Sequence, residues 1–123
     1  MEHVKKQETV RRSNSSNCIV YEFPMKTGEM NICVAEIAGR YPEQGYVINH
    51  QCNEMGYVLN GSGKLVTESQ EAVLSAGDAV YIPPGEKYYW EGNITLVLPC
   101  APAWTPTQYE FVKSSKELQD SIL

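Results

Sequence analysis

Short apolar runs alternate with turn residues along most of the chain. Alternation of this kind, at nearly even spacing, favours a sandwich or small barrel of antiparallel strands. The pattern therefore predicts one all-β domain over residues 18–112. The runs are "CIVYEF", "MNICVAEIA", "YVINHQC", "GYVLNG", "KLVTE", "AVLSA", "AVYIPP", "KYYWEG", "ITLVLPC" and "QYEFV".

Turn residues and polar ends frame these runs. The "NGSG" at 60–63 predicts a hairpin, and "SAGD" at 75–78 and "PPG" at 83–85 predict two further turns. Residues 1–17 are polar without a sustained period, so we expect an N-terminal arm or a short helix. At 113–123 the segment containing "SSKELQDSIL" predicts a tail or a short helix.

Alternation in "YVINHQC" assigns side chains to the two faces of one strand. The even positions Tyr46, Ile48, His50 and Cys52 are mostly apolar, so this set is expected to face inward. His50 would then point into the barrel, and Glu54 joins the same face if the strand continues. A bare buried carboxylate is costly, so Glu54 needs a partner.

Composition and charge narrow the class of protein. The chain has 123 residues, 42% apolar and 20% charged, as in one ordinary globular domain. Its net charge is −5 and no basic stripe runs along it, so we expect no nucleic-acid partner. Without a secretory signal or a run long enough to span a membrane, a cytoplasmic location is expected. The four cysteines form no CxxC pair, which excludes a zinc ribbon and predicts free thiols.

Two segments resemble the motifs of the cupin superfamily. In the first, His50 precedes Glu54 by three intervening residues, and six more separate Glu54 from Gly61. The second is "GDAVYIPPG" at 77–85, which matches the glycine and proline positions of the family. The resemblance implies a cupin-type β-barrel, a double-stranded β-helix or jelly roll, with a site inside the barrel mouth. It also implies a homodimer.

The metal ligands of that family are incomplete in this chain. Metal-bearing cupins use three histidines and a glutamate, but Ile48 and Tyr88 occupy two of the histidine positions. Only His50 and Glu54 remain, so no cofactor is firmly implied. The alternative is a divalent transition metal (zinc, iron, manganese or nickel) on a remodelled set of His50, Cys52, Glu54 and Tyr88.

An aromatic pocket for an organic ligand is the other interpretation. Tyr88 and Trp90 share one strand face, and aromatic faces with a few polar groups commonly line pockets. His50 and Glu54 are the catalytic candidates, as general acid and base or as hydrogen-bond anchors. The structural alternatives are a core histidine and a Glu54 that pairs with Lys87 or Arg40. The candidate ligand-binding residues are His50, Cys52, Glu54, Tyr88 and Trp90.

Three functions are compatible with these motifs. The first is a small cupin barrel that binds a small organic ligand, with weak or no metal dependence. The second is a metal-dependent oxygenase, isomerase or lyase with a remodelled ligand set. The third is a structural or regulatory oligomer whose barrel is filled by side chains. The expected partners are a small molecule and a second copy of the chain, with neither nucleic acid nor membrane.

Overall fold

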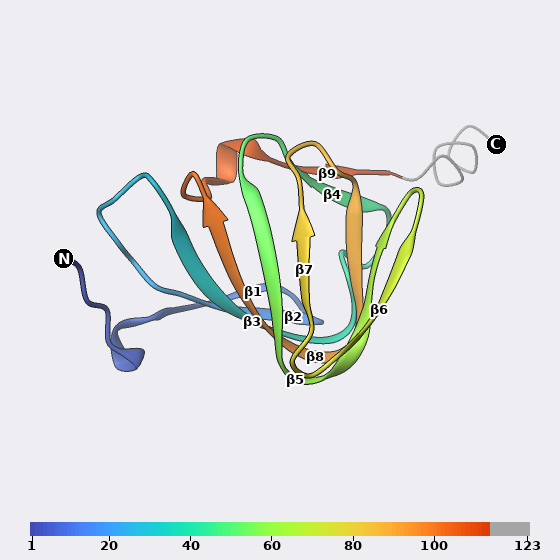
Figure 1. Cartoon of the computed structure of the whole chain (residues 1–123), viewed down its shortest axis with the longest axis horizontal. Helices are drawn as coiled ribbons and strands as arrows, with labels where there is room; N and C mark the ends of the chain where they lie inside the picture. Colours follow the sequence, from blue (N-terminus) through green and yellow to red (C-terminus); the bar gives the residue numbers. More distant parts are fainter. Residues whose placement is uncertain (114–123) are drawn as a thin grey trace.

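A computed structural model describes residues 1–113, and these fold into one curled antiparallel sheet (Figure 1). The all-β prediction is confirmed, and the described part of the chain contains no α-helix. The predicted C-terminal helix lies outside the described residues. None of the elements described is a helix suited to crossing a membrane. The strands are β1 Val10–Ser15, β2 Cys18–Glu22, β3 Asn31–Tyr41, β4 Tyr46–Asn49, β5 Asn53–Thr67, β6 Glu71–Ser75, β7 Ala79–Ile82, β8 Tyr88–Ala101 and β9 Tyr109–Val112, with 3-10 turns η1 Lys6–Glu8 and η2 Pro106–Gln108.

Strand β8 is the centre of the sheet. It pairs with β3 on one side and with β5 on the other, while β6 and β7 extend the sheet beyond β5. Strand β2 pairs with the other edge of β3, and β1 pairs with β2 at the edge of the sheet. The concave face of this curl carries the core, in which Val47, Val58 and Leu96 are fully buried. Successive side chains of β5 and β8 point to opposite faces of the sheet, so every second residue faces the interior.

The hairpin predicted at "NGSG" is wrong. Strand β5 runs without interruption from Asn53 to Thr67 and remains paired with β8 through these residues, with a register shift between Val58 and Asn60. Gly61 has φ +82°, and a Cβ there would lie 2.1 Å from the Asn93 carbonyl oxygen. Glycine at position 61 thus allows the two bent strands to approach each other closely. In the sequence, a glycine required for this reason looks the same as a glycine required by a turn. The turns expected at 75–78 and 83–85 are confirmed.

The polar N-terminal stretch is not a separate arm or helix throughout. Residues 10–15 form β1, which pairs with β2 at the edge of the sheet. Nearly every β1 residue is exposed, so the strand lacks the alternation of apolar and polar residues that marks half-buried strands. The sequence between 1 and 17 therefore predicts no strand even though the backbone forms one.

Candidate functional site

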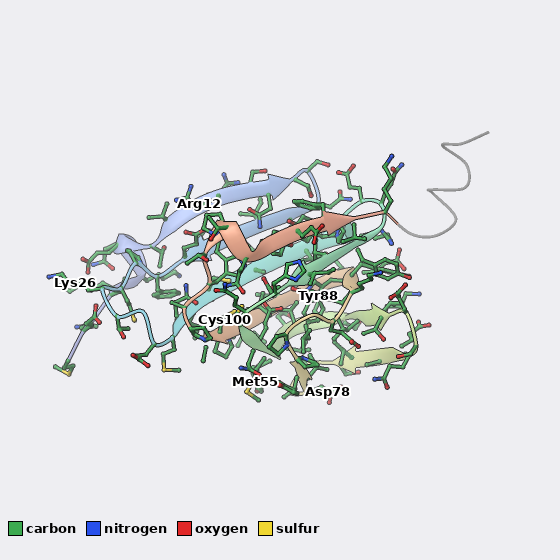
Figure 2. All side chains as sticks on the ribbon, turned by 90° about the horizontal axis from the view of Figure 1, so that it is seen from above. Arg12, Lys26, Met55, Asp78, Tyr88 and Cys100 are labelled. Atoms are coloured by element: carbon green, nitrogen blue, oxygen red, sulfur yellow. The ribbon has the colours of Figure 1, made fainter. Side chains whose placement is uncertain are left out.

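A cavity of about 750 Å³ opens on the concave side of the sheet. Strands β1, β2, β3, β5, β8 and β9 contribute to its wall, together with the segment that joins β8 to β9. Both tryptophans and both phenylalanines of the chain line it, as do three tyrosines. In Figure 2, Tyr88 and Cys100 lie between the two sides of the curl, whereas Met55 and Asp78 lie at its outside. An aromatic interior of this size is typical of small-molecule sites.

Glu54 carries the buried charge in this cavity. Strand β5 directs alternate residues inward, which places Glu54 on the same face as the fully buried Val58. Its residue exposure is 6%, and in the ladder it faces Cys100 of β8. The Tyr88 hydroxyl donates to its Oε2 at 3.0 Å, and the Cys100 thiol donates to its Oε1 at 3.5 Å. The inward orientation predicted for Glu54 is therefore confirmed, with neutral partners.

Burial raises the pKa of Glu54 to about 7, because desolvation disfavours the carboxylate. The hydrogen bonds from Tyr88 and Cys100 act in the opposite direction and lower it. Burial and the Glu54 charge together raise the pKa of Tyr88 well above 10, so this phenol stays protonated. The pair consists of a carboxyl group that exchanges its proton near neutrality and a phenol that donates a hydrogen bond.

A line of hydrogen bonds holds Tyr88 in place. The Trp104 indole donates from Nε1 to Asn49 Oδ1 at 2.9 Å, and Asn49 Nδ2 donates to the Tyr88 hydroxyl oxygen at 3.1 Å. Asn31 Oδ1 accepts a hydrogen bond from the Trp104 backbone N–H at 3.0 Å, which holds the segment between β8 and β9 against β3. Because its oxygen accepts from Asn49, the Tyr88 hydroxyl is left to direct its hydrogen at Glu54.

Sequence reasoning missed Asn49 and Trp104 as members of this site. Asn49 occupies an odd position of "YVINHQC", on the face expected to point outward, yet it is 2% exposed. The reason is that β4 lies between β8 and β9 and is buried on both faces. A buried asparagine with a polar partner is not distinguishable from an exposed one by alternation. Trp104 lies in the segment between β8 and β9 and lines the cavity.

The inward orientation predicted for His50 is wrong. Strand β4 ends at Asn49 and the chain bends, so the period of two is lost before His50. The side chain is 51% exposed, and its Nε2 lies 2.7 Å from Oε1 of Glu110 on β9. His50 does not line the cavity. The structure thus separates the two residues that the first motif predicted to act together, His50 and Glu54.

Cys52 is buried as predicted but lies behind the cavity wall. Its backbone N–H donates to Gln108 Oε1 at 2.8 Å. A hydrogen bond with the Cys100 thiol lowers the pKa of Cys52. All four cysteines are free, as the sequence predicts. Cys52 behaves here as a small core residue that supports the Cys100 thiol next to Glu54.

The remodelled metal set is not assembled. His50 points away from Glu54, and Tyr88 stays a phenol. Within residues 1–113, histidine, cysteine, aspartate and glutamate side chains nowhere gather in threes in a way that could hold a metal ion. Zinc takes three or four protein ligands. These donors therefore do not fit a cupin-type transition metal.

The ion pairs suggested for Glu54 are also absent from the described residues. Lys87 lies 3.6 Å from Glu68, and Arg40 donates to the backbone oxygens of Pro42 and Gly45. Glu54 is consequently a buried carboxyl group with hydrogen-bond donors but no salt bridge within the described chain.

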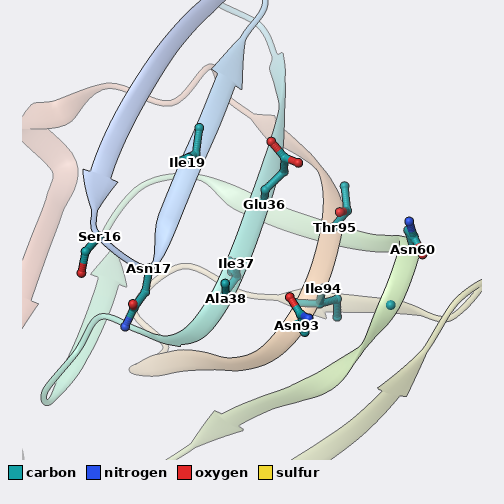
Figure 3. A pocket seen from close by; sticks show the side chains of 11 residues that line it. Ser16, Asn17, Ile19, Glu36, Ile37, Ala38, Asn60, Asn93, Ile94 and Thr95 are labelled. Carbon is teal, nitrogen blue, oxygen red and sulfur yellow. The ribbon is translucent and has the colours of Figure 1, made fainter.

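A second hollow of about 380 Å³ lies on the outer side of β2, β3, β8 and β5 (Figure 3). Its polar side chains include Asn17, Glu36, Asn60 and Asn93. Glu36 is exposed to solvent. The inner cavity is the better candidate because it alone of the two contains a buried titratable group.

A curled antiparallel sheet with a cavity on its concave side defines the class of protein. The model of the Cupin domain family matches residues 40–100, which is about half of the chain. The chain belongs to the cupin superfamily, and the cupin-type fold predicted from its motifs is confirmed. Among curated proteins, no significant match was found.

Solved structures agree on the fold. Pac13, described as a nucleoside dehydratase, superposes with a TM-score of 0.82 at 18% identity, covering 92% of each chain. Variants of Pac13 from Streptomyces were solved with uridine. An RmlC-like cupin from Shewanella frigidimarina has a TM-score of 0.69 at 20% identity, covering 84% of this chain and 93% of that one. Ectoine synthase from P. lautus has a TM-score of 0.70 at 14% identity, covering 93% and 91%. At these identities the likeness shows the fold alone.

Proposed function

We propose that this cupin binds a small organic molecule in its barrel interior, against Glu54 and Tyr88, and needs no metal to do so. The observation that carries the proposal is a buried carboxyl group at the wall of an aromatic cavity of about 750 Å³. Pockets for small molecules measure about 300–1,000 Å³ and combine apolar walls with a few polar groups. Glu54 supplies the polar group that orients the ligand.

Acid–base catalysis is a second candidate function, favoured by the pKa of Glu54. A group with a pKa of about 7 is populated in both protonation states at neutral pH, which suits a general acid and base. In a dehydration, its carboxylate accepts a proton from carbon, and the protonated form returns it to the departing hydroxyl, which leaves as water. A dehydratase with this fold, Pac13, supports the lyase class over the other acid–base reactions.

Homodimer formation is the third part of the proposal. Large apolar side chains are exposed on the outer face of β5 and β7, among them Met55, Tyr57, Leu59 and Tyr81. Monomeric proteins rarely expose contiguous apolar patches of this kind. Light scattering coupled to gel filtration is expected to give twice the mass of the chain. A monomer at micromolar concentration would contradict this part alone.

A ligand screen with two variants tests the central proposal. Tryptophan fluorescence and saturation-transfer NMR follow binding of nucleosides, sugars, hydroxy acids and amines to metal-free protein, because Trp90 and Trp104 line the cavity. Glu54→Gln keeps the volume and removes the charge; Glu110→Gln does the same on the surface. We expect binding that weakens at least tenfold in Glu54→Gln and is unchanged in Glu110→Gln. Equal binding in both variants would refute the proposal.

A further inference from the structure

Among residues 1–113, one charged group that lines the cavity has no oppositely charged partner. Three charged residues line it, namely Arg12, Glu22 and Glu54. Arg12 and Glu22 pair with each other, with Nε and Oε1 2.9 Å apart, and both are partly exposed to solvent. In Figure 2, Arg12 lies well away from Tyr88, to which Glu54 is hydrogen-bonded. The interior of the described chain therefore carries an uncompensated negative charge whenever Glu54 is ionised.

Seven aromatic side chains also line the cavity. Trp104, Tyr109, Phe111 and Tyr41 follow one another in edge-to-face contacts with centroids 5.4–6.5 Å apart. Tyr88 and Trp90 form another such pair, 6.2 Å apart. The faces of aromatic rings carry partial negative charge and attract cations, an effect that grows when water is excluded. Rings and carboxylate thus favour the same sign of ligand charge.

The charge of a ligand affects how favourably it binds beside Glu54 and the aromatic rings. An anion would be repelled by Glu54, or would force it to remain protonated. A neutral molecule gains hydrogen bonds and apolar contact but leaves the carboxylate without a countercharge. A cation supplies that countercharge and interacts with the ring faces as well.

We infer that the ligand of this cavity is a small organic cation, an ammonium compound whose positive group lies among the aromatic rings beside Glu54. The inference rests on the proposed function, since it names the charge class of the molecule that the barrel interior binds. An amine or quaternary ammonium group on a short hydroxylated chain fits the cavity volume and its mixed polar and aromatic wall.

Binding of such a cation is linked to release of a proton. The cation needs the ionised form of Glu54, whose pKa is about 7 in the ligand-free protein. Affinity therefore rises with pH up to about 8 and then levels off. The other titratable groups that face Glu54 are phenols and thiols, of which only Cys52 has a lowered pKa. They are Tyr88 and Cys100 on β8, Tyr109 on β9, Cys33 on β3, and Cys52 ahead of β5.

Calorimetry with matched pairs of ligands tests the charge class. Choline is compared with 3,3-dimethylbutan-1-ol, and ethanolamine with propan-1-ol, because each pair shares its shape and differs in charge. Uridine serves as a larger neutral ligand. The titrations use the full chain at pH 6.0 and pH 8.5, with Glu54→Gln and Cys52→Ser as variants. Buffers of different ionisation enthalpy report the proton that is released.

We expect at least one ammonium compound to bind about tenfold more tightly than its neutral isostere. A single group with a pKa of about 7 makes that binding about tenfold tighter at pH 8.5 than at pH 6.0. Both differences vanish in Glu54→Gln and persist in Cys52→Ser. The pH dependence in the unmodified protein keeps the test valid even if Glu54→Gln folds poorly.

Two results would overturn the inference, and only the second would also refute the proposed ligand-binding function. If uridine or a neutral isostere binds as well as the cations, the charge class is wrong while the proposed function stands. If no compound of either charge binds in the cavity, the cation inference and the proposed ligand-binding function fail together.

Discussion

Tyr88 donates its phenolic hydrogen to Glu54 across 3.0 Å in the barrel interior, where neither residue is more than 6% exposed. Asn49 fixes the direction of this hydrogen bond, because its amide N–H donates to the same phenol oxygen and leaves the phenol hydrogen for Glu54. Tyr88 occupies a histidine position of the cupin motif, and its hydroxyl is hydrogen-bonded to a carboxyl group.

Glu54 is predicted to make the protein less stable as pH rises. Its folded pKa of about 7 lies above the ordinary value of 4.5, so the folded state binds the proton more tightly. This contribution is fully present below pH 4.5 and is lost as pH rises through 7. The loss amounts to about 3 kcal/mol at 1.36 kcal/mol per pKa unit. Urea unfolding between pH 4.5 and 8 measures it.

Glu54→Gln is the reference for that experiment, because it cannot titrate. Its free energy of unfolding is expected to vary much less over the same pH interval. Parallel curves for the two proteins would show that another group causes the dependence.

Trp104→Phe is predicted to destabilise the protein through Asn49. The change keeps a large ring but removes the Nε1–H that donates to Asn49 Oδ1. An amide oxygen left unsatisfied in a buried site costs about 1–3 kcal/mol. Urea unfolding of Trp104→Phe, Asn49→Leu and the double variant measures this. The double variant should lose less than the sum of the single losses; strict additivity would argue against the hydrogen bond.

Gly56→Ala is predicted to displace Trp90 from its position in the cavity wall. A Cβ at Gly56 would lie 3.0 Å from Trp90 Cη2 and 3.2 Å from Val80 Cγ2. Overpacking of this kind costs about 1–3 kcal/mol. Gly28→Ala is the matched control, because a Cβ there has nothing within 4 Å. Thermal unfolding and Trp fluorescence should change in the first variant only. An unaltered Gly56→Ala protein would mean that Trp90 does not pack over β5.

His50→Ala is predicted to leave binding in the barrel interior unchanged. Its imidazole pairs with Glu110 on the surface, and exposed pairs contribute about 1 kcal/mol or less. Ligand titrations of the variant should match those of the parent protein. Metal analysis of untagged protein gives a second readout. Near-stoichiometric metal in the parent that disappears in His50→Ala would contradict the outward orientation of this residue.

Sequence reasoning identified the fold and much of the interior, and its errors have physical causes. The motif spacing around Glu54, together with "GDAVYIPPG", was sufficient for the cupin fold. Glu54, Tyr88 and Trp90 were placed correctly because β5 and β8 keep strict alternation through them. His50 was misplaced because the strand ends one residue earlier, and a single sequence seldom marks such an end.

The hydrogen-bond line behind Tyr88 was beyond prediction for a different reason. Asn49 and Trp104 are 55 positions apart, and only the fold of the segment between β8 and β9 brings them together. The same holds for "NGSG", where Gly61 lies against Asn93 of β8 and Gly63 against Gly92, in a bend of β5 rather than a turn. Contacts between distant segments set these features, whereas local pattern sets the strands.

Carbon-13 NMR titration of the Glu54 carboxyl group, assigned with Glu54→Gln, measures directly whether this group is desolvated in the barrel interior. We expect a midpoint near pH 7, because the carboxyl group is buried and has no ion-pair partner among residues 1–113. In Tyr88→Phe the midpoint should rise further, since the lost hydrogen bond favours the ionised form; Tyr81→Phe, which removes an exposed hydroxyl, should leave it unchanged. A midpoint near 4.5 in the parent protein would contradict a buried, unpaired carboxyl group, because Glu54 would then be solvated or paired with a positive charge.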